Sequence, residues 1–383
     1  MSIEIASHLA KANIGQHERP MAEKYRGYSA VTNRPVRLLA VCSRYSLPYR
    51  VLRCAAAAGA TVYAMGNIGS GSLRLSRYTA GFIETECPID GEGAPLLVQE
   101  INKAVSDHGI DMVMAAGHLA KRSLVMARER IDAPCFPMPE TGHFEMLNNK
   151  WAFTRHCQAQ GVTCPQSWLF PGAAPLFRRL ERGQLTLPLV AKPLDFDGGH
   201  GVKILTTLNW QAALAEIDYA PIIAQRLIEG EDIGAAVFCR GGRMENVIAH
   251  RYQHGVYEAF ADSAIRDAIG RILHPLTTNG VFNFDMRRDR DGKVHFLECN
   301  PRFFFKIGLA METGFNFVAF GINRTSGVPA MPRKTITVRR PVAAILRALS
   351  HARIDRRDLR MMRRLWADPL PFIRESLRID WDE

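Results

Sequence analysis

The chain has 383 residues, of which 47% are hydrophobic and 23% are charged, and its formal net charge is +11. This length allows two or three domains with cores of their own, and the composition is that of an ordinary soluble globular protein. No apolar run is long enough to span a membrane, and the first 34 residues lack the apolar segment of a secretory signal. We therefore expect a cytoplasmic protein with no membrane partner.

The eight cysteines are scattered along the chain, and no two of them form a C-x-x-C pair. Most of them lie within apolar runs, which favours buried free thiols over disulfides or a zinc site. This pattern is typical of a cytosolic protein.

The first part of the chain, residues 35–145, predicts strands that alternate with helices. The expected strands cover 36–44, 61–67 and 110–117, and the expected helices cover 47–59 and 94–108. Such alternation implies a parallel sheet, so we predict a Rossmann-like domain. The turn after its first strand lacks G-x-G-x-x-G, which gives no support to dinucleotide binding. Residues 1–34 are expected to form a loosely ordered extension.

The middle of the chain, residues 146–330, predicts a second α/β region with antiparallel hairpins. A helix is expected to begin at 148 and stop near Gly161, and further helices are expected over 260–279 and 307–326. Strands are expected on both sides of a glycine-rich loop within 187–205. Two more should flank a bend near Gly230 within 220–238.

The last part, residues 331–383, is basic, with 13 Lys or Arg against 7 Asp or Glu. Its segment 351–366 has a helical pattern and could meet nucleic acid or an anionic lipid surface. The alternative is a helix packed on the body of the protein through Leu359, Met362 and Leu365. No known nucleic-acid module accompanies the charge, so we do not expect a nucleic-acid partner.

The stretch "FNFDMRRDRDGKVHFLECNPRF" (282–303) predicts a β-hairpin around Asp291-Gly292, a pair typical of a two-residue type I′ turn. Such a turn pairs Arg290 with Lys293. It then places Asp285 opposite Glu298, and Asn283 opposite Asn300.

The two faces of this hairpin differ in chemistry, because side chains alternate along a strand. One face is expected to carry Asn283, Asp285, Glu298 and Asn300, and the other Phe282, Phe284, Met286, Leu297 and Cys299. Two opposed carboxylates are destabilising unless a partner neutralises them, and Mg²⁺ prefers such oxygen ligands. The alternative is a polar face exposed to solvent.

The glycine-rich loop Asp197–Gly201 lies between two expected strands, and its backbone N–H groups could bind phosphates. Lys192 precedes it within an apolar strand, where an ammonium group without a partner would be costly. A bound polyphosphate would supply that partner. The alternative for the loop alone is an ordinary turn.

Taken in order, the motifs "NNKWAF", "VAKPLDFDGGHGV", "IIAQRLIEGEDI" and the hairpin stretch resemble the ATP-grasp superfamily over most of residues 35–325. The resemblance implies an α/β fold (α+β overall) with a Rossmann-like domain over 35–145 and an ATP-grasp domain over 146–330. The latter would comprise a small lid domain, about 150–225, and a mixed-sheet C-terminal domain that holds ATP. Residues 331–383 would form a basic helical tail.

The resemblance also implies roles for individual residues. Lys150 and Lys192 would contact the ATP phosphates under a loop formed by Gly198, Gly199, His200 and Gly201, and the segment Gln225, Arg226, Leu227 and Ile228 would bind the adenine. Asp232, or alternatively Glu231, would bind the ribose. Asp285, Glu298 and Asn300 would hold Mg²⁺ or Mn²⁺, and Arg302 would face the phosphoryl group and the substrate carboxylate.

This chain departs from the family pattern at several positions. Gln225 replaces a common hinge acid, Asn283 stands where some relatives carry a catalytic Arg, and Phe303–Phe305 replace small residues. The segment 249–263 could line the substrate site, with Arg251 as its best catalytic candidate.

The activity implied by the resemblance is that of a ligase that joins a carboxylate to an amine through an acyl phosphate. The alternatives are a carboxylase-like or kinase-like enzyme that phosphorylates a small acid, and a non-catalytic ATP-binding regulatory module. Dimers are common among the proteins that this chain resembles, which makes a homodimer a candidate assembly.

Overall fold

The computed structural model describes residues 34–89, 95–196, 198–323, 334–337, 363 and 366–377. Almost all of the expected N-terminal extension and most of the basic stretch 351–366 lie outside these residues. Val36–Glu383 forms one compact unit, which contains all the elements below. Within the described ranges, no helix combines the length and the apolar character needed to cross a membrane.

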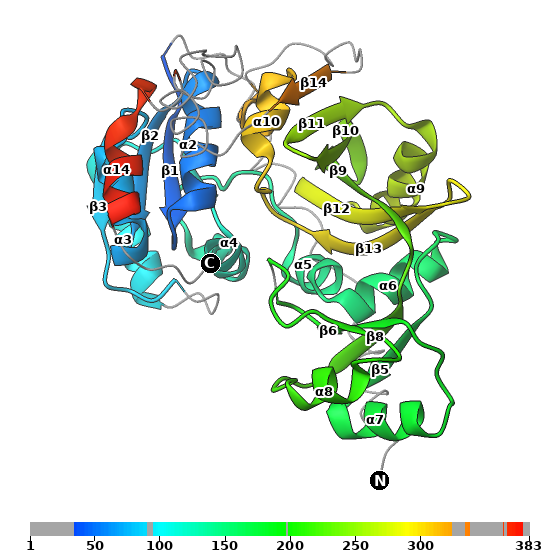
Figure 1. Ribbon diagram of the computed structural model, residues 1–383. Coiled ribbons are helices and arrows are strands. Elements are labelled where there is room, and N and C mark those ends of the chain that lie inside the picture. The colour runs from blue at the N-terminus through cyan, green and yellow to red at the C-terminus, as the bar shows by residue number, and fades with distance from the viewer. Residues whose placement is uncertain are drawn as a thin grey trace, which may run out of the picture. The chain divides into compact units, whose positions relative to one another are not determined.

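The N-terminal part of this unit is built on a four-stranded parallel sheet with the order β3-β2-β1-β4 (Figure 1). Gly59 and Gly109 adopt positive φ after two of the predicted helices and so end them there. The elements are β1 (Arg37–Cys42), α2 (Ser46–Ala57), β2 (Thr61–Gly66), the 3₁₀ helix η2 (Ile68–Leu75), β3 (Gly81–Glu84), α3 (Pro95–His108), β4 (Met112–Ala115), α4 (His118–Ala127) and η3 (Arg128–Arg130).

A second, smaller sheet has the order β5-β8-β6-β7, and all its pairings are antiparallel. It has a core of its own, which includes Leu176, Leu189 and Ile222. The helix expected from 148 to near Gly161 is α6, and a helix that was not expected, α5, precedes it. The elements are α5 (Thr141–Asn148), α6 (Lys150–Ala159), β5 (Ser167–Phe170), α7 (Ala173–Glu181), β6 (Leu189–Pro193), β7 (Lys203–Leu205), α8 (Trp210–Ala215) and β8 (Ile222–Arg226).

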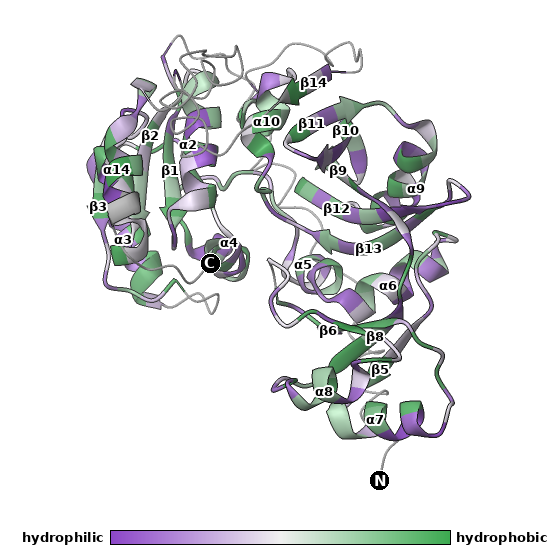
Figure 2. Ribbon diagram, viewed as in Figure 1, coloured by the Kyte–Doolittle hydropathy of each residue, from purple (hydrophilic) through white to green (hydrophobic). Residues whose placement is uncertain are grey.

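The largest sheet has the order β13-β12-β9-β10-β11-β14. A mixed sheet was expected, but each pairing among its described strands is antiparallel. Its strands alternate between hydrophilic and hydrophobic residues (Figure 2), and one face packs with α6 and α9 in a common core. The elements are β9 (Gly230–Arg240), β10 (Arg243–Gln253), β11 (Val256–Phe260), α9 (Ser263–Leu273), η4 (His274–Leu276), β12 (Gly280–Asp289), β13 (Val294–Asn300) and β14 (Lys334–Thr337).

The β12–β13 hairpin has the predicted pairing at the site but not the predicted turn. Asp289 N donates to Lys293 O (2.9 Å), so three residues form the loop, and Gly292 ends it with φ of 84°. A bulge between Asp285 and Met286 then restores the pairs Asp285–Glu298 and Asn283–Asn300. The prediction that Leu297 faces the core is wrong, because the bulge places Phe296 there instead.

The single helix expected over 307–326 is two short helices, α10 (Ile307–Glu312) and α11 (Phe317–Gly321). Gly314, with φ of 105°, separates them, and Asn316 caps the second. Asn316 Nδ2 also donates to Cys54 O (2.8 Å), which ties these helices to α2. A further helix, α14 (Pro369–Leu377), lies against η2.

Candidate functional site

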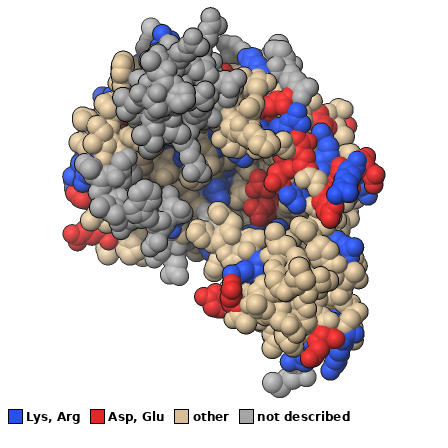
Figure 3. Space-filling view, viewed as in Figure 1, with Lys and Arg blue, Asp and Glu red and all other residues tan. Residues whose placement is uncertain are grey.

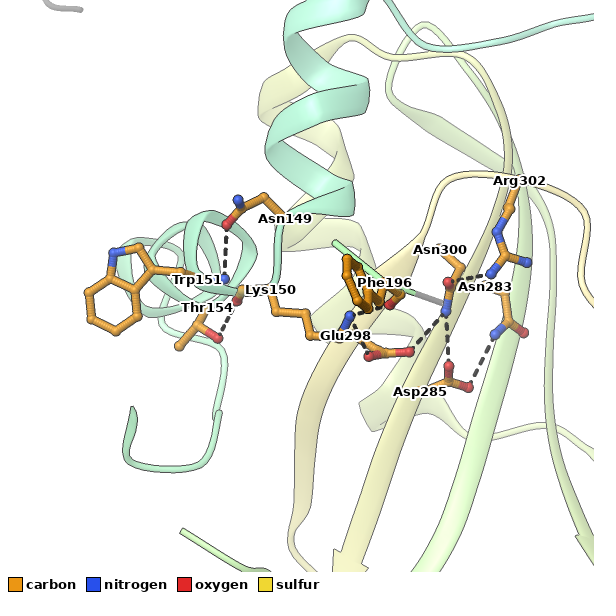
Figure 4. Close-up of polar contacts among 10 residues, drawn as sticks. All are labelled: Asn149, Lys150, Trp151, Thr154, Phe196, Asn283, Asp285, Glu298, Asn300 and Arg302. Atoms are coloured by element: carbon orange, nitrogen blue, oxygen red, sulfur yellow. Dashed lines mark hydrogen bonds and ion pairs between the residues drawn. The ribbon is translucent and has the colours of Figure 1, made fainter. Parts of the chain in front are cut away.

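Lys150 is the first residue of α6 (Figure 4), and four hydrogen bonds fix its position. The side chain of Asn149 accepts from Trp151 N and Ala152 N and so begins the helix. Lys150 N donates to Leu194 O (2.8 Å), and Nζ donates to Phe196 O (2.7 Å). The helix start is therefore tied to the chain that leads into the glycine-rich loop.

Two buried lysines face one carboxylate at the centre of the site. Lys150 Nζ lies 3.5 Å from Glu298 Oε2, and Lys192 on β6 interacts electrostatically with the same carboxylate. Burial alone would raise the pKa of Glu298, but the two lysines hold it below its ordinary value. Burial lowers the pKa of Lys192 in spite of Glu298. Glu298 is thus an ionised partner shared by two cations from separate segments.

Asp285 lies opposite Glu298 in the hairpin and has the reverse electrostatics. Burial and the charge of Glu298 raise its pKa to about 7. Asn300 Nδ2 donates to Asp285 Oδ2 (2.9 Å) and to Glu298 Oε1 (3.3 Å), and Asn283 Nδ2 donates to Asp285 Oδ1 (3.2 Å). Asn300 Oδ1 in turn accepts from Arg302 Nη2 (2.9 Å). The structure therefore brings together Asp285, Glu298, Asn300 and Arg302 (Figure 4).

This donor set fits a divalent cation. Burial and the adjacent Glu298 carboxylate raise the pKa of Asp285, and a bound cation would relieve the repulsion between the two carboxylates. Within the described part of the chain, no group of three or more His, Cys, Asp or Glu side chains could hold a metal. A cation here would therefore depend on the two carboxylates and on ligand phosphates, as Mg²⁺ commonly does beside nucleotides. Asn300 could add its amide oxygen only by giving up its present bonds, in which Nδ2 faces the carboxylates and Oδ1 faces Arg302.

The glycine-rich loop is exposed at Gly198, Gly199 and His200. Gly198, Gly199 and Gly201 have φ of 66°, 80° and 72°, a region that residues with side chains rarely adopt. A Cβ atom on Gly201 would also lie 2.9 Å from the ring of Tyr219. The loop therefore depends on its glycines, as a backbone that approaches phosphates would. Asp197 lies outside the described residues.

The expected adenine hinge follows β8. Gln225 is buried, its Nε2 donates to Ser167 Oγ (3.0 Å), and its Oε1 has no partner among the described residues. Arg226 N donates to Gln166 O (2.8 Å), and Ile228 O accepts from Arg287 Nη1 (2.8 Å). Two backbone groups proposed for adenine therefore already have partners, and Leu227 N bonds Pro188 O (3.3 Å).

Arg287 is a residue that the sequence reasoning missed. Its Nε also donates to Asp232 Oδ1 (2.7 Å), so one guanidinium joins the hinge to the expected ribose acid. Arg287 pairs with Asp232 across β12 and β9, in register with the Asp285–Gly234 pair two residues away. The run of charges in "DMRRD" was a signal that could have identified it.

Arg251 is not brought to the face that carries Asp285. Its Nε donates to Glu258 (2.6 Å) and its Nη1 to Glu231 (2.7 Å). By strand alternation it shares a face with Ala249, which lies in the core cluster. In Figure 3, basic and acidic side chains are interleaved over this part of the molecule. Arg251 therefore belongs to an ion-pair network that includes Glu231, whereas Asp232 lies two residues from Gly234, which pairs with Asp285.

The three phenylalanines after Arg302 have three different surroundings. Phe303 is buried and contacts Phe136, while Phe304 is buried and stacks on His250 with an interplanar angle of 8°. Phe305 is 55% exposed and lies under the Arg50 guanidinium, 4.5 Å from its ring centroid. Only the first two can shape the interior.

His250 lies in the same row of the sheet as Asp285, with Gly234 between them. A Cβ atom on Gly234 would lie 2.3 Å from His250 Cε1, so only glycine leaves room for the ring. Burial lowers the pKa of His250 to about 3, which keeps the imidazole neutral. His250 therefore packs as a buried, neutral ring stacked on Phe304.

A family model matches the part of the chain that carries the hairpin. Residues 218–345 match the model of a family described as ATP-grasp in the biosynthetic pathway with Ter operon. That match covers much of the largest sheet, including β9 to β13 and the ligand candidates Asp285, Glu298 and Asn300.

Solved structures show the same fold over most of the chain. An L-amino acid ligase from Bacillus licheniformis superposes with a TM-score of 0.60 and 19% identity, over 81% of this chain and 82% of its own. An N5-carboxyaminoimidazole synthetase from Staphylococcus aureus in complex with ADP gives a TM-score of 0.61 and 11% identity, over 80% and 83%.

A third similar structure is the biotin carboxylase domain of the Hydrogenobacter thermophilus 2-oxoglutarate carboxylase, in complex with MgADP and bicarbonate. Its TM-score is 0.57 at 16% identity, over 75% of this chain and 68% of its own. No curated protein sequence matches the chain. At these identities the likeness establishes the ATP-grasp fold, which confirms the predicted resemblance and fold class.

Proposed function

We propose that the protein is an ATP-dependent ligase that joins a carboxylate to an amine and releases ADP and phosphate. One observation carries this proposal: α6, β6 and the β12–β13 hairpin bring two buried lysines to a pair of carboxylates, with Arg302 beside them. Such a cluster suits a polyphosphate and a divalent cation. The L-amino acid ligase with the same fold supports the choice of reaction.

In this proposal Lys150 and Lys192 bind the phosphates of ATP, while Asp285, Glu298 and Asn300 hold the cation. Mg²⁺ bound there would neutralise the oxygens of the transferring phosphoryl group. Lys150 Nζ would exchange its bond to Phe196 O for a phosphate oxygen. Gly198–Gly201 would close over the phosphates and exclude water.

The chemistry takes two steps. A carboxylate oxygen attacks the γ-phosphorus, the bond to the β-phosphate oxygen breaks, and ADP leaves. The amine then attacks the acyl carbon and loses a proton, and phosphate leaves with one oxygen of the original acid. In this proposal Arg302, whose Nη2 donates to Asn300 Oδ1, stabilises the negative charge that develops near the reacting acid.

The related reactions remain distinct candidates. A carboxylase-like enzyme would use bicarbonate, which is bound in the complex of the Hydrogenobacter thermophilus domain. A regulatory module would bind ATP without turnover. These alternatives differ from the ligase in what they need before they release ADP, so one assay separates them.

The test is a screen of acid and amine pairs for phosphate release, with the mass of each product measured. We expect release only when MgATP, an acid and an amine are all present. Glu298→Gln should reduce it at least about 100-fold. Glu245→Gln is the matched control, because Glu245 is ion-paired with Arg240 on the distant β9–β10 hairpin. Undiminished turnover in Glu298→Gln would refute the site assignment, and ADP release with bicarbonate alone would favour the carboxylase.

A further inference from the structure

Lys306 is a half-buried cation that the proposed nucleotide site does not use. It is the N-cap residue of α10, and its Nζ lies over the ring of Tyr252 on β10, 5.7 Å from the ring centroid. Over the part of the chain that the structure describes, no carboxylate pairs with Nζ and no atom accepts a hydrogen bond from it. The closest partner of this charge is therefore the face of an aromatic ring.

This ammonium group lies on the face of the largest sheet that carries the candidate cation site. Asp285 pairs with Gly234, and Gly234 pairs with His250, so the three residues form one row across β12, β9 and β10. Directly paired side chains share a face, and Tyr252 shares it too, because it lies two residues after His250. Lys306 also interacts electrostatically with Asp285 and with His250. It therefore reaches over the same face as the hairpin carboxylates.

The two ends of this face carry different cations. Lys150 meets Glu298 at β13, whereas Lys306 lies over β10, and the strand order is β13-β12-β9-β10. Neighbouring strands are about 4.8 Å apart, so β10 is roughly 10 Å from β12 and its Asp285. A group bound at Lys306 would thus be separate from the expected phosphoryl group. A substrate a few carbon atoms long would still span the two places.

The surroundings of Lys306 are open to a dissolved ligand. Tyr252 is 42% exposed, and Phe305, the residue before Lys306, is 55% exposed. A divalent cation bound at Asp285 would neutralise the carboxylate that now attracts Lys306. The ammonium group would then be left for an anionic group of the substrate, and lysine binds a carboxylate as a compact point charge.

We propose that Lys306 binds a carboxylate that the ligation does not consume, here called the spectator carboxylate. This inference rests on the proposed ligase function. It makes Lys306 a determinant of substrate choice, and it leaves the nucleotide to Lys150, Lys192 and the hairpin carboxylates. The spectator carboxylate belongs either to a dicarboxylic acid or to an amine that is itself an amino acid, and the test separates these two sources.

The test measures melting temperatures with MgADP bound, using pairs of probes that differ in one carboxylate. The pairs are succinate and butyrate, glutarate and valerate, glycine and glycinamide, and L-alanine and L-alaninamide. In the native protein, at least one probe with the additional carboxylate should raise the melting temperature by about 2 °C or more above its matched partner. A difference within the first two pairs identifies the acid as the source, and one within the last two identifies the amine.

Substitutions of Lys306 show whether this difference depends on its charge. Lys306→Met and Lys306→Gln should abolish the difference within the responding pair, and Lys306→Arg should retain it, because it keeps the positive charge. Lys103→Met, at an exposed lysine of α3, is the matched control and should behave as the native protein does. The proposal is overturned if no pair differs in the native protein, or if the difference persists in both Lys306→Met and Lys306→Gln.

A second readout separates a binding role from a structural one. Without any ligand, Lys306→Met and Lys306→Gln should melt within about 2 °C of the native protein, because a contact with a partly exposed ring contributes little. A larger fall in both variants would show that Lys306 is structural and would also overturn the proposal.

The same experiment keeps the two proposals apart. If MgADP fails to stabilise the native protein, the nucleotide site and the proposed function fail. If MgADP stabilises the native protein and both Lys306 variants equally, while the probes of each pair act alike on all three, only the inference about Lys306 fails.

Discussion

Three lysines are buried in the described part of the chain, and they have two different kinds of surroundings. Lys150 and Lys192 share the carboxylate of Glu298, which neighbours Asp285. Lys121 on α4 has no carboxylate partner among the described residues, and the small pocket that it lines is also lined by the cation Arg302. Two of the buried lysines thus share an anion, while no carboxylate among the described residues pairs with the third.

The difference in charge between these surroundings determines which ligands each can bind. A site that holds both carboxylates and lysines can bind a divalent cation together with an anionic phosphate chain, since each charge type finds a partner. The surroundings of Lys121 lack such a carboxylate among the described residues. Arg302 and the phenylalanines after it join the two regions.

The largest expected effect concerns the region with its own anions. Lys192→Met should reduce turnover at least about 10³-fold, because it removes a cation from the transferring phosphoryl group. Steady-state phosphate release with MgATP and the acid and amine pair found in the screen measures this. Lys203→Met, at a lysine of β7 ion-paired with Glu216, is the control and should stay near the native rate. If both variants retain turnover, Lys192 does not act on the phosphoryl group, and the proposed difference between the buried lysines is contradicted.

A smaller effect distinguishes the phenylalanines that join the regions. Phe304→Ala should lower the free energy of unfolding by about 3 kcal/mol, because it leaves a cavity beside His250. Phe305→Ala should cost no more than about 1 kcal/mol, because more than half of the residue is exposed and its ring lies under the Arg50 guanidinium. Denaturant unfolding compares them, and equal losses would contradict the interior role of Phe304.

The smallest effect concerns His250. It tests whether a buried basic side chain with no anion beside it stays neutral in the folded protein. The pKa of His250 is lowered to about 3 in the folded protein. Below pH 6.5 the imidazole is therefore protonated in the unfolded chain and stays neutral in the folded protein. The native protein should therefore lose about 1.4 kcal/mol per pH unit relative to His250→Leu as the pH falls from 6.5. By pH 5 the difference should have changed by about 2 kcal/mol. Parallel pH profiles of the two proteins, measured by urea unfolding, would refute it.

The sequence was informative where local pattern and spacing decide the structure. The alternation of strands and helices in 36–117 follows from periodicity and from helix-ending glycines. The Asp285–Glu298 pairing also agrees with the prediction, although two differences cancel: a three-residue loop and a bulge replace the two-residue turn. The bulge depends on tertiary packing of Phe296, which no local rule contains.

The sequence could not show which cations lack anions. Arg251 looked like a substrate ligand, but Glu231 and Glu258 reach it from neighbouring strands. The burial of Lys121 was not predicted, although its position within the apolar stripe of a helix indicates it. Its proximity to Arg302 arises from residues 181 positions apart. The proposed roles of the site residues and the domain boundaries stay predictions until measured.

The central claim is that the protein activates an acid by phosphorylating it. The most direct test uses the acid found in the screen, labelled with ¹⁸O in its carboxylate, together with MgATP and the amine. If an acyl phosphate forms, the released phosphate should carry one ¹⁸O atom per turnover, and ADP should accumulate in equal amount. Unlabelled phosphate, or the release of AMP and pyrophosphate, would contradict the account.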